Sequence, residues 1–276
     1  TAGGSRAEDA VGFRAYDLHH VDRHENRGEL TVVFGTESGE LKGVVLGRHL
    51  GIARTGALGG VAIDCMSPGQ AATLGVIGAG RQAKSQVLAA LAVRPSLCHC
   101  KIWSRQKTRA ELLVASLADI AKVSFSVAAS PQDAVQDAEI VVTATSSPAA
   151  LLKAEWLSPG CHINYVGPKF ITAHELGIDI LENCEVIVTD ALQQLHHDPR
   201  LTLSGNPKVQ CLSKWLQGSV QGGARLSLFY SLGLAGTEVL LAADLLHVAA
   251  PADAEQGGLR EWLGSCWRVF IVSICS

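Results

Sequence analysis

The chain has 276 residues, of which 47% are apolar and 18% are charged, and its formal net charge is −3. This composition excludes a disordered chain, and the lack of surplus positive charge argues against nucleic acid as a partner. No membrane span is predicted. The apolar stretch Ser231–Ala250 carries Glu238, Asp244 and His247, and Cys266–Cys275 has about half of the roughly 20 residues that a spanning helix needs.

The first part of the chain is rich in β-forming residues. Strands are predicted over Gly12–His19, Leu30–Phe34 and Leu41–Leu46. Turn-forming residues between the last two predict an antiparallel hairpin. A helix of small residues is predicted over Leu50–Met66, and the Ser67-Pro68-Gly69 sequence that follows indicates a domain boundary.

The middle of the chain alternates between strand and helix patterns. Six strands are predicted, over Thr73–Gly78, Lys101–Ser104, Val123–Ala128, Glu139–Thr145, Cys161–Gly167 and Glu185–Asp190. Helices are predicted between them, over Arg81–Val93, Gln106–Ile120, a short segment that opens at Ser130, and Thr172–Asn183. Beyond these, helices are predicted over Leu212–Gln217 and Leu228–Val248. Strands that alternate with helices predict a parallel sheet covered on both faces.

The predicted fold is therefore α/β, with two domains. Residues 67–226 form a doubly wound, Rossmann-type parallel sheet that binds a dinucleotide. Residues 1–66 and 227–276 form a smaller antiparallel α+β domain.

The cysteine and histidine residues give weaker signals. Eight cysteines are scattered without a C-x-x-C pair, which favours reduced thiols in a cytoplasmic protein, and no signal peptide is evident. Two short groups could offer metal ligands, but each lacks a further ligand, so solvated turn residues are the favoured interpretation and no metal is predicted. They are His20 with Asp22 and His24, and His196 with His197 and Asp198.

A glycine-rich loop carries the clearest chemical signal. Gly78, Gly80 and Ala83 form a G-x-G-x-x-A sequence with Arg81 and Gln82 between them, after an apolar strand and at the start of a helix. The first glycine permits a tight turn and the second lets the backbone approach a pyrophosphate. The helix N-terminus then offers N–H groups and partial positive charge to the phosphates. The loop therefore predicts a dinucleotide site.

The end of the second strand of that domain indicates which dinucleotide binds. NAD is usually recognised there by an acidic residue that bonds to the ribose 2′-hydroxyl. This chain instead has Ser104, Arg105 and Lys107. Cationic side chains can pair with a 2′-phosphate, so NADP is the predicted cofactor and NAD is the alternative.

Several motifs give a specific resemblance to a known family. They are Ala53–Ala57 (ARTGA), the GAGRQA loop, Ile102–Arg105 (IWSR), Val142–Ser147 (VTATSS), Gly160–Gly167 (GCHINYVG) and Phe229–Ala235 (FYSLGLA). Together they resemble the ornithine cyclodeaminase/mu-crystallin family from about Val11 to about Val248. The resemblance implies a homodimer whose smaller domain serves substrate binding and dimerisation. It also implies hydride transfer between a nicotinamide and the α-carbon of a small amino or imino acid.

The resemblance also implies roles for particular residues. Arg54 would bind the substrate carboxylate, since a planar guanidinium can hold it with two bonds. Thr55 would lie near the cofactor phosphates. The residues implied to line the nicotinamide side are Thr143, Thr145, Val166, Gly167, Ser231 and Gly233.

Two positions depart from the family pattern. Arg14 stands where the family has an active-site lysine; arginine can bind a carboxylate but stays protonated. Lys169 stands where cyclodeaminases and alanine dehydrogenases carry an aspartate. It is either an acid or base whose pKa burial lowers, or a solvated loop lysine. Two cations near the reacting centre would repel a cationic substrate tail, so ornithine and lysine are expected to be poor substrates.

These observations favour an NAD(P)-dependent amino or imino acid oxidoreductase. Two alternatives remain. One is an ornithine-type cyclodeaminase, which recycles its cofactor within one turnover. The other is a crystallin-like protein that binds NADPH without relevant turnover, which the replaced lysine and aspartate favour.

Overall fold

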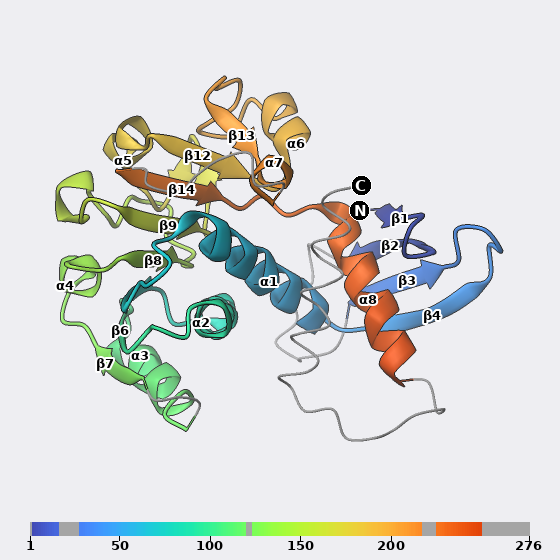
Figure 1. Cartoon of the computed structure of the whole chain (residues 1–276), viewed down its shortest axis with the longest axis horizontal. Helices are drawn as coiled ribbons and strands as arrows, with labels where there is room; N and C mark the ends of the chain where they lie inside the picture. The colour runs from blue at the N-terminus through green and yellow to red at the C-terminus, as the bar shows by residue number, and fades with distance from the viewer. Residues whose placement is uncertain (1, 17–27, 120–122, 217–224, 250–276) are drawn as a thin grey trace. The chain divides into compact units, whose positions relative to one another are not determined.

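The structure is a computed structural model that describes residues 2–16, 28–119, 123–216 and 225–249. The chain divides into two compact units: unit 1, from residues 1–57 and 233–276, and unit 2, from residues 58–232 (Figure 1). The predicted boundaries lay after Met66 and before Ser227. The difference has a physical cause at each end, because the C-terminal part of helix α1 packs on the parallel sheet and Leu226–Tyr230 forms a strand of that sheet.

Unit 1 is built on an antiparallel sheet with the order β1-β2-β3-β4. Its strands are β1 (Ala2–Ser5), β2 (Ala10–Tyr16), β3 (Glu29–Phe34) and β4 (Leu41–Leu46). Helix α8 (Ala235–Ala249) packs on one face, where Gly12 lies against Val239 and Gly43 against Leu246. The predicted β3–β4 hairpin is confirmed, whereas β1 was not predicted.

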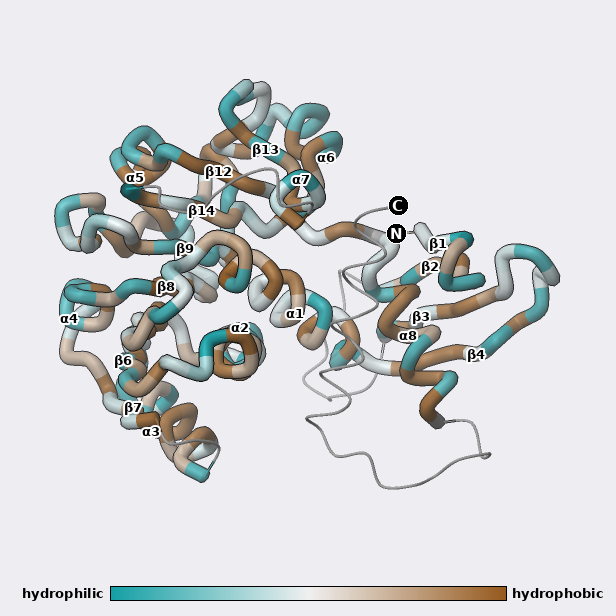
Figure 2. The backbone as a smooth tube through the Cα atoms, in the orientation of Figure 1, coloured by the Kyte–Doolittle hydropathy of each residue, from teal (hydrophilic) through white to brown (hydrophobic). Residues whose placement is uncertain are grey.

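The other face of this sheet is apolar and exposed. Phe13 pairs with Val32 and Val32 pairs with Val44, so these three side chains point to the same side. Phe13 is 42% exposed and Leu46 is 71% exposed. The apolar positions along these strands can be followed in Figure 2. An apolar face of this kind marks an interaction surface.

Unit 2 contains one parallel sheet of eight strands in the order β13-β12-β14-β9-β8-β5-β6-β7. The strands are β5 (Thr73–Ile77), β6 (His99–Trp103), β7 (Ser124–Val127), β8 (Ile140–Thr143), β9 (Cys161–Tyr165), β12 (Val186–Thr189), β13 (Val209–Cys211) and β14 (Leu226–Tyr230). The six predicted strands are all present, and β13 and β14 add two more.

The position of β14 corrects the prediction of a helix over Leu228–Val248. All five residues of Leu226–Tyr230 are buried, and the strand lies between β9 and β12. The helix begins only at Ala235, after Gly233 with a φ of +93°. The physical reason is that an apolar run buried on both sides has no helical or strand periodicity, so its pattern cannot separate the two structures.

Helices cover both faces of the parallel sheet, as expected for a doubly wound fold (Figure 1). One face packs on α1 (His49–Met66), α2 (Arg81–Val93) and α3 (Lys107–Ala115). The other packs on α4 (Pro131–Val135), α5 (Ile178–Asn183) and α6 (Leu192–His197). The remaining elements are α7 (Leu212–Leu216), the short 3₁₀ helix η1 (Ala154–Trp156), β10 (Lys169–Phe170) and β11 (Ala173–His174). The predicted α/β fold class is confirmed.

The segment after β9 also differs from prediction. A helix was expected over Thr172–Asn183, but only Ile178–Asn183 is helical. The residues before it form the β10–β11 hairpin, in which Lys169 pairs with His174. This hairpin brings two charged residues of the segment, Lys169 and Glu175, to the carboxyl end of the sheet.

Two regions named in the sequence lie outside the described residues: the candidate ligands His20, Asp22 and His24, and the apolar tail Cys266–Cys275. Within the described part of the chain, no helix is both long enough and apolar enough to cross a membrane.

Candidate active site

The glycine-rich loop joins β5 to α2 as the sequence predicts. Gly78 has a φ of +118°, and a Cβ atom there would collide with the backbone carbonyl of Ala144. Its N–H donates to the carbonyl of Trp103 at 2.8 Å. No larger residue fits at this turn, so Gly78 is fixed by geometry.

The start of α2 fits a phosphate group. Gly80 is the N-cap residue, its missing side chain would face open space, and no side chain caps the helix. The first turn contains no acidic residue. The Oε1 atom of Gln82 is buried and has no hydrogen-bond partner among the described residues. The N–H groups of the first helical turn and the open space at Gly80 together fit a pyrophosphate at this helix end.

The second strand, β6, ends where the cofactor ribose is expected. Ser104 is half-buried, and Arg105 is exposed on the loop that precedes α3. Lys107 opens α3 and its Nζ lies 3.6 Å from a carboxylate oxygen of Glu111. Both cations are exposed, and Arg105 lies outside the helix on the loop that directly follows β6.

Lys169 is a buried lysine, not a solvated one. It is 5% exposed, and its Nζ donates to the carbonyl of Gly167 at 2.6 Å. The ammonium lies 4.4 Å from the ring centroid of Tyr165 and 5.6 Å from that of Tyr230. Burial lowers the pKa of Lys169 to about 7, although the charges of Glu175 and Asp190 act to raise it. A buried amine with this pKa can exchange a proton near neutral pH.

Glu175 connects the segments that follow two neighbouring strands. Its Oε2 accepts from the N–H and the hydroxyl of Thr145, at 2.9 and 2.6 Å, and its Oε1 accepts from the N–H of Gly167 at 2.7 Å. Burial raises the pKa of this carboxyl, and the Thr145 hydroxyl and Lys169 oppose that shift. Three donors point at the two oxygens, which is the arrangement that an ionised carboxylate requires.

The other predicted residues of unit 2 gather at the same sheet edge. Thr143 is the last residue of β8, and Val166 follows β9 directly. Ser231 follows β14 and donates its N–H to the carbonyl of Tyr165. Asp190 follows β12, is buried, and accepts from the N–H of Leu232 at 2.8 Å. Carboxyl ends of parallel strands are where doubly wound folds bind their ligands.

Unit 1 holds both predicted arginines in a cluster of charged side chains, of which Glu238 is buried and the others are half-buried. One oxygen of Glu238, on α8, accepts from Arg14 Nη1 at 2.7 Å and from Arg54 Nε at 2.8 Å. Glu238 is 2% exposed. Arg14 Nη2 also lies 2.6 Å from Glu29. The shared Glu238 carboxylate makes it possible to hold two half-buried guanidinium groups side by side.

Two further predicted residues belong to this unit. The guanidinium of Arg54 packs against Gly233, where a Cβ atom would collide with its nitrogens. The hydroxyl of Thr55 donates to the carbonyl of Gly51 within α1 at 2.8 Å. Gly233 thus contacts the arginine that the sequence assigned to substrate.

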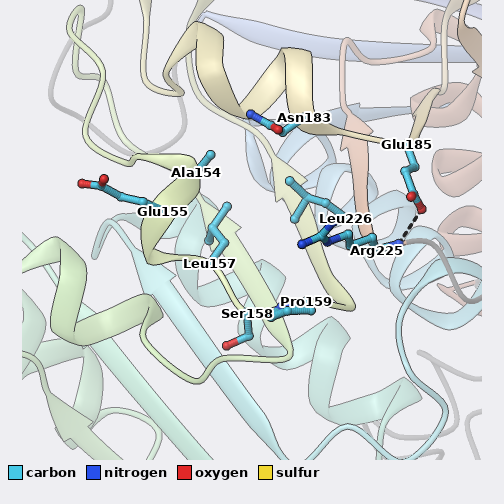
Figure 3. Close-up of a pocket in the computed structure, with 9 residues that line it drawn as sticks. All are labelled: Ala154, Glu155, Leu157, Ser158, Pro159, Asn183, Glu185, Arg225 and Leu226. Atoms are coloured by element: carbon cyan, nitrogen blue, oxygen red, sulfur yellow. Dashed lines mark hydrogen bonds between the residues drawn. The ribbon is translucent and has the colours of Figure 1, made fainter.

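The described residues contain no group of three or more His, Cys, Asp or Glu side chains that could hold a metal ion. A cavity of about 470 Å³ lies at the amino ends of β9 and β14, with Asn183, Glu185 and Arg225 among the residues that line it (Figure 3). Because the glycine loop is at the carboxyl end of the sheet, this cavity is separate from the candidate site.

The sequence analysis does not predict four charged residues of these clusters as site residues: Glu29, Glu175, Asp190 and Glu238. Glu238 gave a signal, as a carboxylate inside an otherwise apolar stretch. Such a residue is costly to bury without a partner. The others carry no comparable sequence signal.

Comparison with known proteins identifies the family. The sequence profile of the ornithine cyclodeaminase/mu-crystallin family matches residues 4–248. Ketimine reductase mu-crystallin of Macropus fuliginosus is 30% identical over 78% of this chain and 67% of that protein. A Delta(1)-pyrroline-2-carboxylate reductase of Bacillus cereus is 28% identical over 77% of this chain and 68% of that protein. An archaeal alanine dehydrogenase dimer with bound NAD superposes with a TM-score of 0.74 and 25% identity, covering 86% of this chain and 76% of that chain.

The doubly wound sheet and its glycine loop define a dinucleotide-binding protein. The chain belongs to the ornithine cyclodeaminase/mu-crystallin family. As a member of that family it is an NAD(P)-dependent oxidoreductase of amino or imino acids, so the predicted family and enzyme class are confirmed. The preference for NADP, the roles of individual residues and the dimer stay predictions.

Proposed function

We propose that the protein reduces a small imino acid to the amino acid, with NADPH as the hydride donor. The observation that carries this proposal is the buried Lys169 ammonium at the carboxyl end of the parallel sheet. Imine reduction needs a hydride at carbon and a proton at nitrogen. A lysine with a pKa of about 7 can supply that proton.

Arg54 binds the substrate carboxylate in this proposal. Glu238 holds the Nε side of the guanidinium, so Nη1 and Nη2 are the atoms for the carboxylate. Arg14 is paired with Glu29 and Glu238, which supports a role in fixing this cluster and not in moving protons. A carboxylate held with two bonds by Arg54 has a fixed orientation, and so has the α-carbon beside it.

The proton step follows from the surroundings of Lys169. A reduced nicotinamide held at the glycine loop would supply the hydride for the new C–H bond at the α-carbon. Lys169 gives its proton to the imine nitrogen as the C=N π bond is lost. The neutral side-chain amine of Lys169 then takes a proton from water. The carbonyl of Gly167 and the ring of Tyr165 hold the ammonium in place through this step.

The substrate tail should be neutral or acidic. An aspartate could accept a hydrogen bond from a distal ammonium, but Lys169 stands at that position and a protonated lysine has no acceptor atom. Ornithine-to-proline conversion is therefore not the favoured activity. The free thiols of the six cysteines that the structure describes support a reducing compartment such as the cytoplasm.

A screen of NADPH consumption tests the proposal, over cyclic imino acids and over 2-oxo acids with amines. We expect NADPH oxidation with a neutral cyclic imino acid and weak or no turnover of ornithine. Efficient conversion of ornithine to proline without net NADPH change would instead establish a cyclodeaminase. Tight NADPH binding with no turnover of any compound would establish the crystallin-like alternative.

The proposed cofactor preference depends on Arg105. A charge-assisted contact to the 2′-phosphate contributes roughly 1.5–3 kcal/mol. We therefore expect Arg105→Ala to raise the Kd for NADPH by about tenfold or more and to leave the Kd for NADH almost unchanged. Calorimetric titration measures both constants. Arg109→Ala, at an exposed position on α3, is the matched control and should change neither. Equal losses of affinity for NADPH and NADH would show that Arg105 does not contact the 2′-phosphate.

The proposed homodimer depends on the exposed face of the antiparallel sheet. Phe13 lies in the middle of this face, beside Val32 and Val44. We expect Phe13→Asp to raise the dimer dissociation constant by about 30-fold or more, because it buries a charge in an apolar interface. Light scattering after size-exclusion chromatography measures the change. Leu112→Asp, at a 70% exposed position on α3, is the control and should remain dimeric. A dimeric Phe13→Asp variant would place the interface elsewhere.

A further inference from the structure

Three charged side chains of unit 2 form a cluster at the carboxyl ends of the central strands. Lys169 follows β9, Glu175 follows the β10–β11 hairpin, and Asp190 follows β12. All three are buried, at 5%, 0% and 7% exposure. Both carboxylates act electrostatically on the Lys169 ammonium. With one cation and two anions, the cluster carries a net charge of −1 when all three groups are ionised.

Gly167 connects two members of this cluster, Lys169 and Glu175, directly. Its N–H donates to Glu175 at 2.7 Å, and its carbonyl accepts from Lys169 at 2.6 Å. Its missing side chain is required, because a Cβ atom would collide with the Glu175 carboxylate. The flanking Tyr165 and Tyr230 add no charge near neutral pH, since burial raises the pKa of both phenols. The positions of Lys169 and Glu175 are therefore fixed by hydrogen bonds and packing at Gly167.

The cofactor's nicotinamide belongs on this side of the sheet. The glycine loop follows β5, and Ser104 and Arg105, which are expected to lie near the adenosine ribose, follow β6. These positions assign the adenosine half of the cofactor to the ends of those two strands. The second half of a dinucleotide then extends across the switch point, toward the carboxyl ends of β8 and β9. The charge cluster lies at that edge.

We propose that Lys169, Glu175 and Asp190 act together as an anionic cluster that binds the oxidised, cationic nicotinamide more tightly than the reduced form. Hydride donation turns a neutral nicotinamide ring into a cation. In the same turnover Lys169 gives up its proton, so the cluster changes from −1 to −2 as the positive charge develops. Charges in a buried site interact far more strongly than in water. The cluster therefore favours hydride donation over hydride uptake.

Two variants with opposite charge changes test this inference. The measured quantity is the ratio of the Kd for NADP⁺ to the Kd for NADPH, determined by calorimetry without substrate. Lys169→Met removes the cation and should lower the ratio by about fivefold or more. Asp190→Asn removes an anion and should raise the ratio by a similar factor. The asparagine oxygen can still accept from the N–H of Leu232, so the backbone contact is kept.

A matched control is Glu139→Gln, which removes a carboxylate near the amino end of β8, where Glu139 accepts from Ala72 and Thr73. This variant should leave the ratio unchanged. Shifts of the same sign in Lys169→Met and Asp190→Asn, or no shift in either, would overturn the inference. If Lys169→Met does not fold, the sign of the Asp190→Asn shift still decides.

Because no turnover is measured, this test stands apart from the imine-reductase proposal. If the two variants shift the Kd ratio in opposite directions but the protein reduces no imine, the inference about the anionic cluster stands and the proposed imine-reductase function is rejected.

Discussion

Replacing Lys169 by methionine should lower kcat for imine reduction by at least about 100-fold. A positioned general acid contributes about 10²–10⁴-fold, and methionine keeps the volume of the side chain without a proton to give. Initial rates at saturating NADPH and imino acid measure the effect. The control is Lys101→Met, at an exposed lysine on β6 that pairs with Asp133, and it should keep the rate of the unmodified protein.

The pH dependence of the same reaction gives a second measure of Lys169. Burial lowers the pKa of this lysine to about 7. The ammonium is the acid, so it is present below this pH and is lost as the pH rises through it. We expect kcat to fall above pH 7 in the unmodified protein and to lack this limb in Lys169→Met. A rate that stays flat from pH 6 to pH 9 would exclude Lys169 as the proton donor.

The second large effect concerns Arg54. Arg54→Lys should lower kcat/KM by about 30-fold or more, because lysine cannot contact Glu238 and a carboxylate with a planar group at once. The Kd for NADPH should change by less than about twofold. Steady-state kinetics and calorimetry on the same preparation separate the two quantities.

Arg109→Lys, on the exposed face of α3, serves as the control and should leave kcat/KM unchanged. A variant at position 54 that keeps the activity of the unmodified protein would assign Arg54 to the structure of unit 1 alone. A variant that loses NADPH affinity as well would place the arginine at the cofactor.

The strands of the parallel sheet could be predicted because the sequence pattern of each segment agrees with its buried place in the sheet. Most predicted strands of residues 67–190 are short apolar runs with a helix or turn signal on either side. The helix Arg81–Val93 was predicted with its observed bounds, since Gly80 precedes it and a proline follows at Pro95. The strand Leu226–Tyr230 was not, because its neighbours β9 and β12 are distant in sequence and only their pairing makes it a strand.

The sequence by itself determined the class of fold, the glycine loop and the family, because these depend on residues close together in the chain. The environment of Lys169 was decided only by the tertiary structure. A lysine after a glycine and a proline has no local mark of burial. The β10–β11 hairpin, the rings of Tyr165 and Tyr230 and the field of Glu175 together bury it and lower its pKa. The pairing of Arg14 and Arg54 through Glu238 has the same cause. These residues come from β2, α1 and α8, and only folding brings their charges within hydrogen-bond distance.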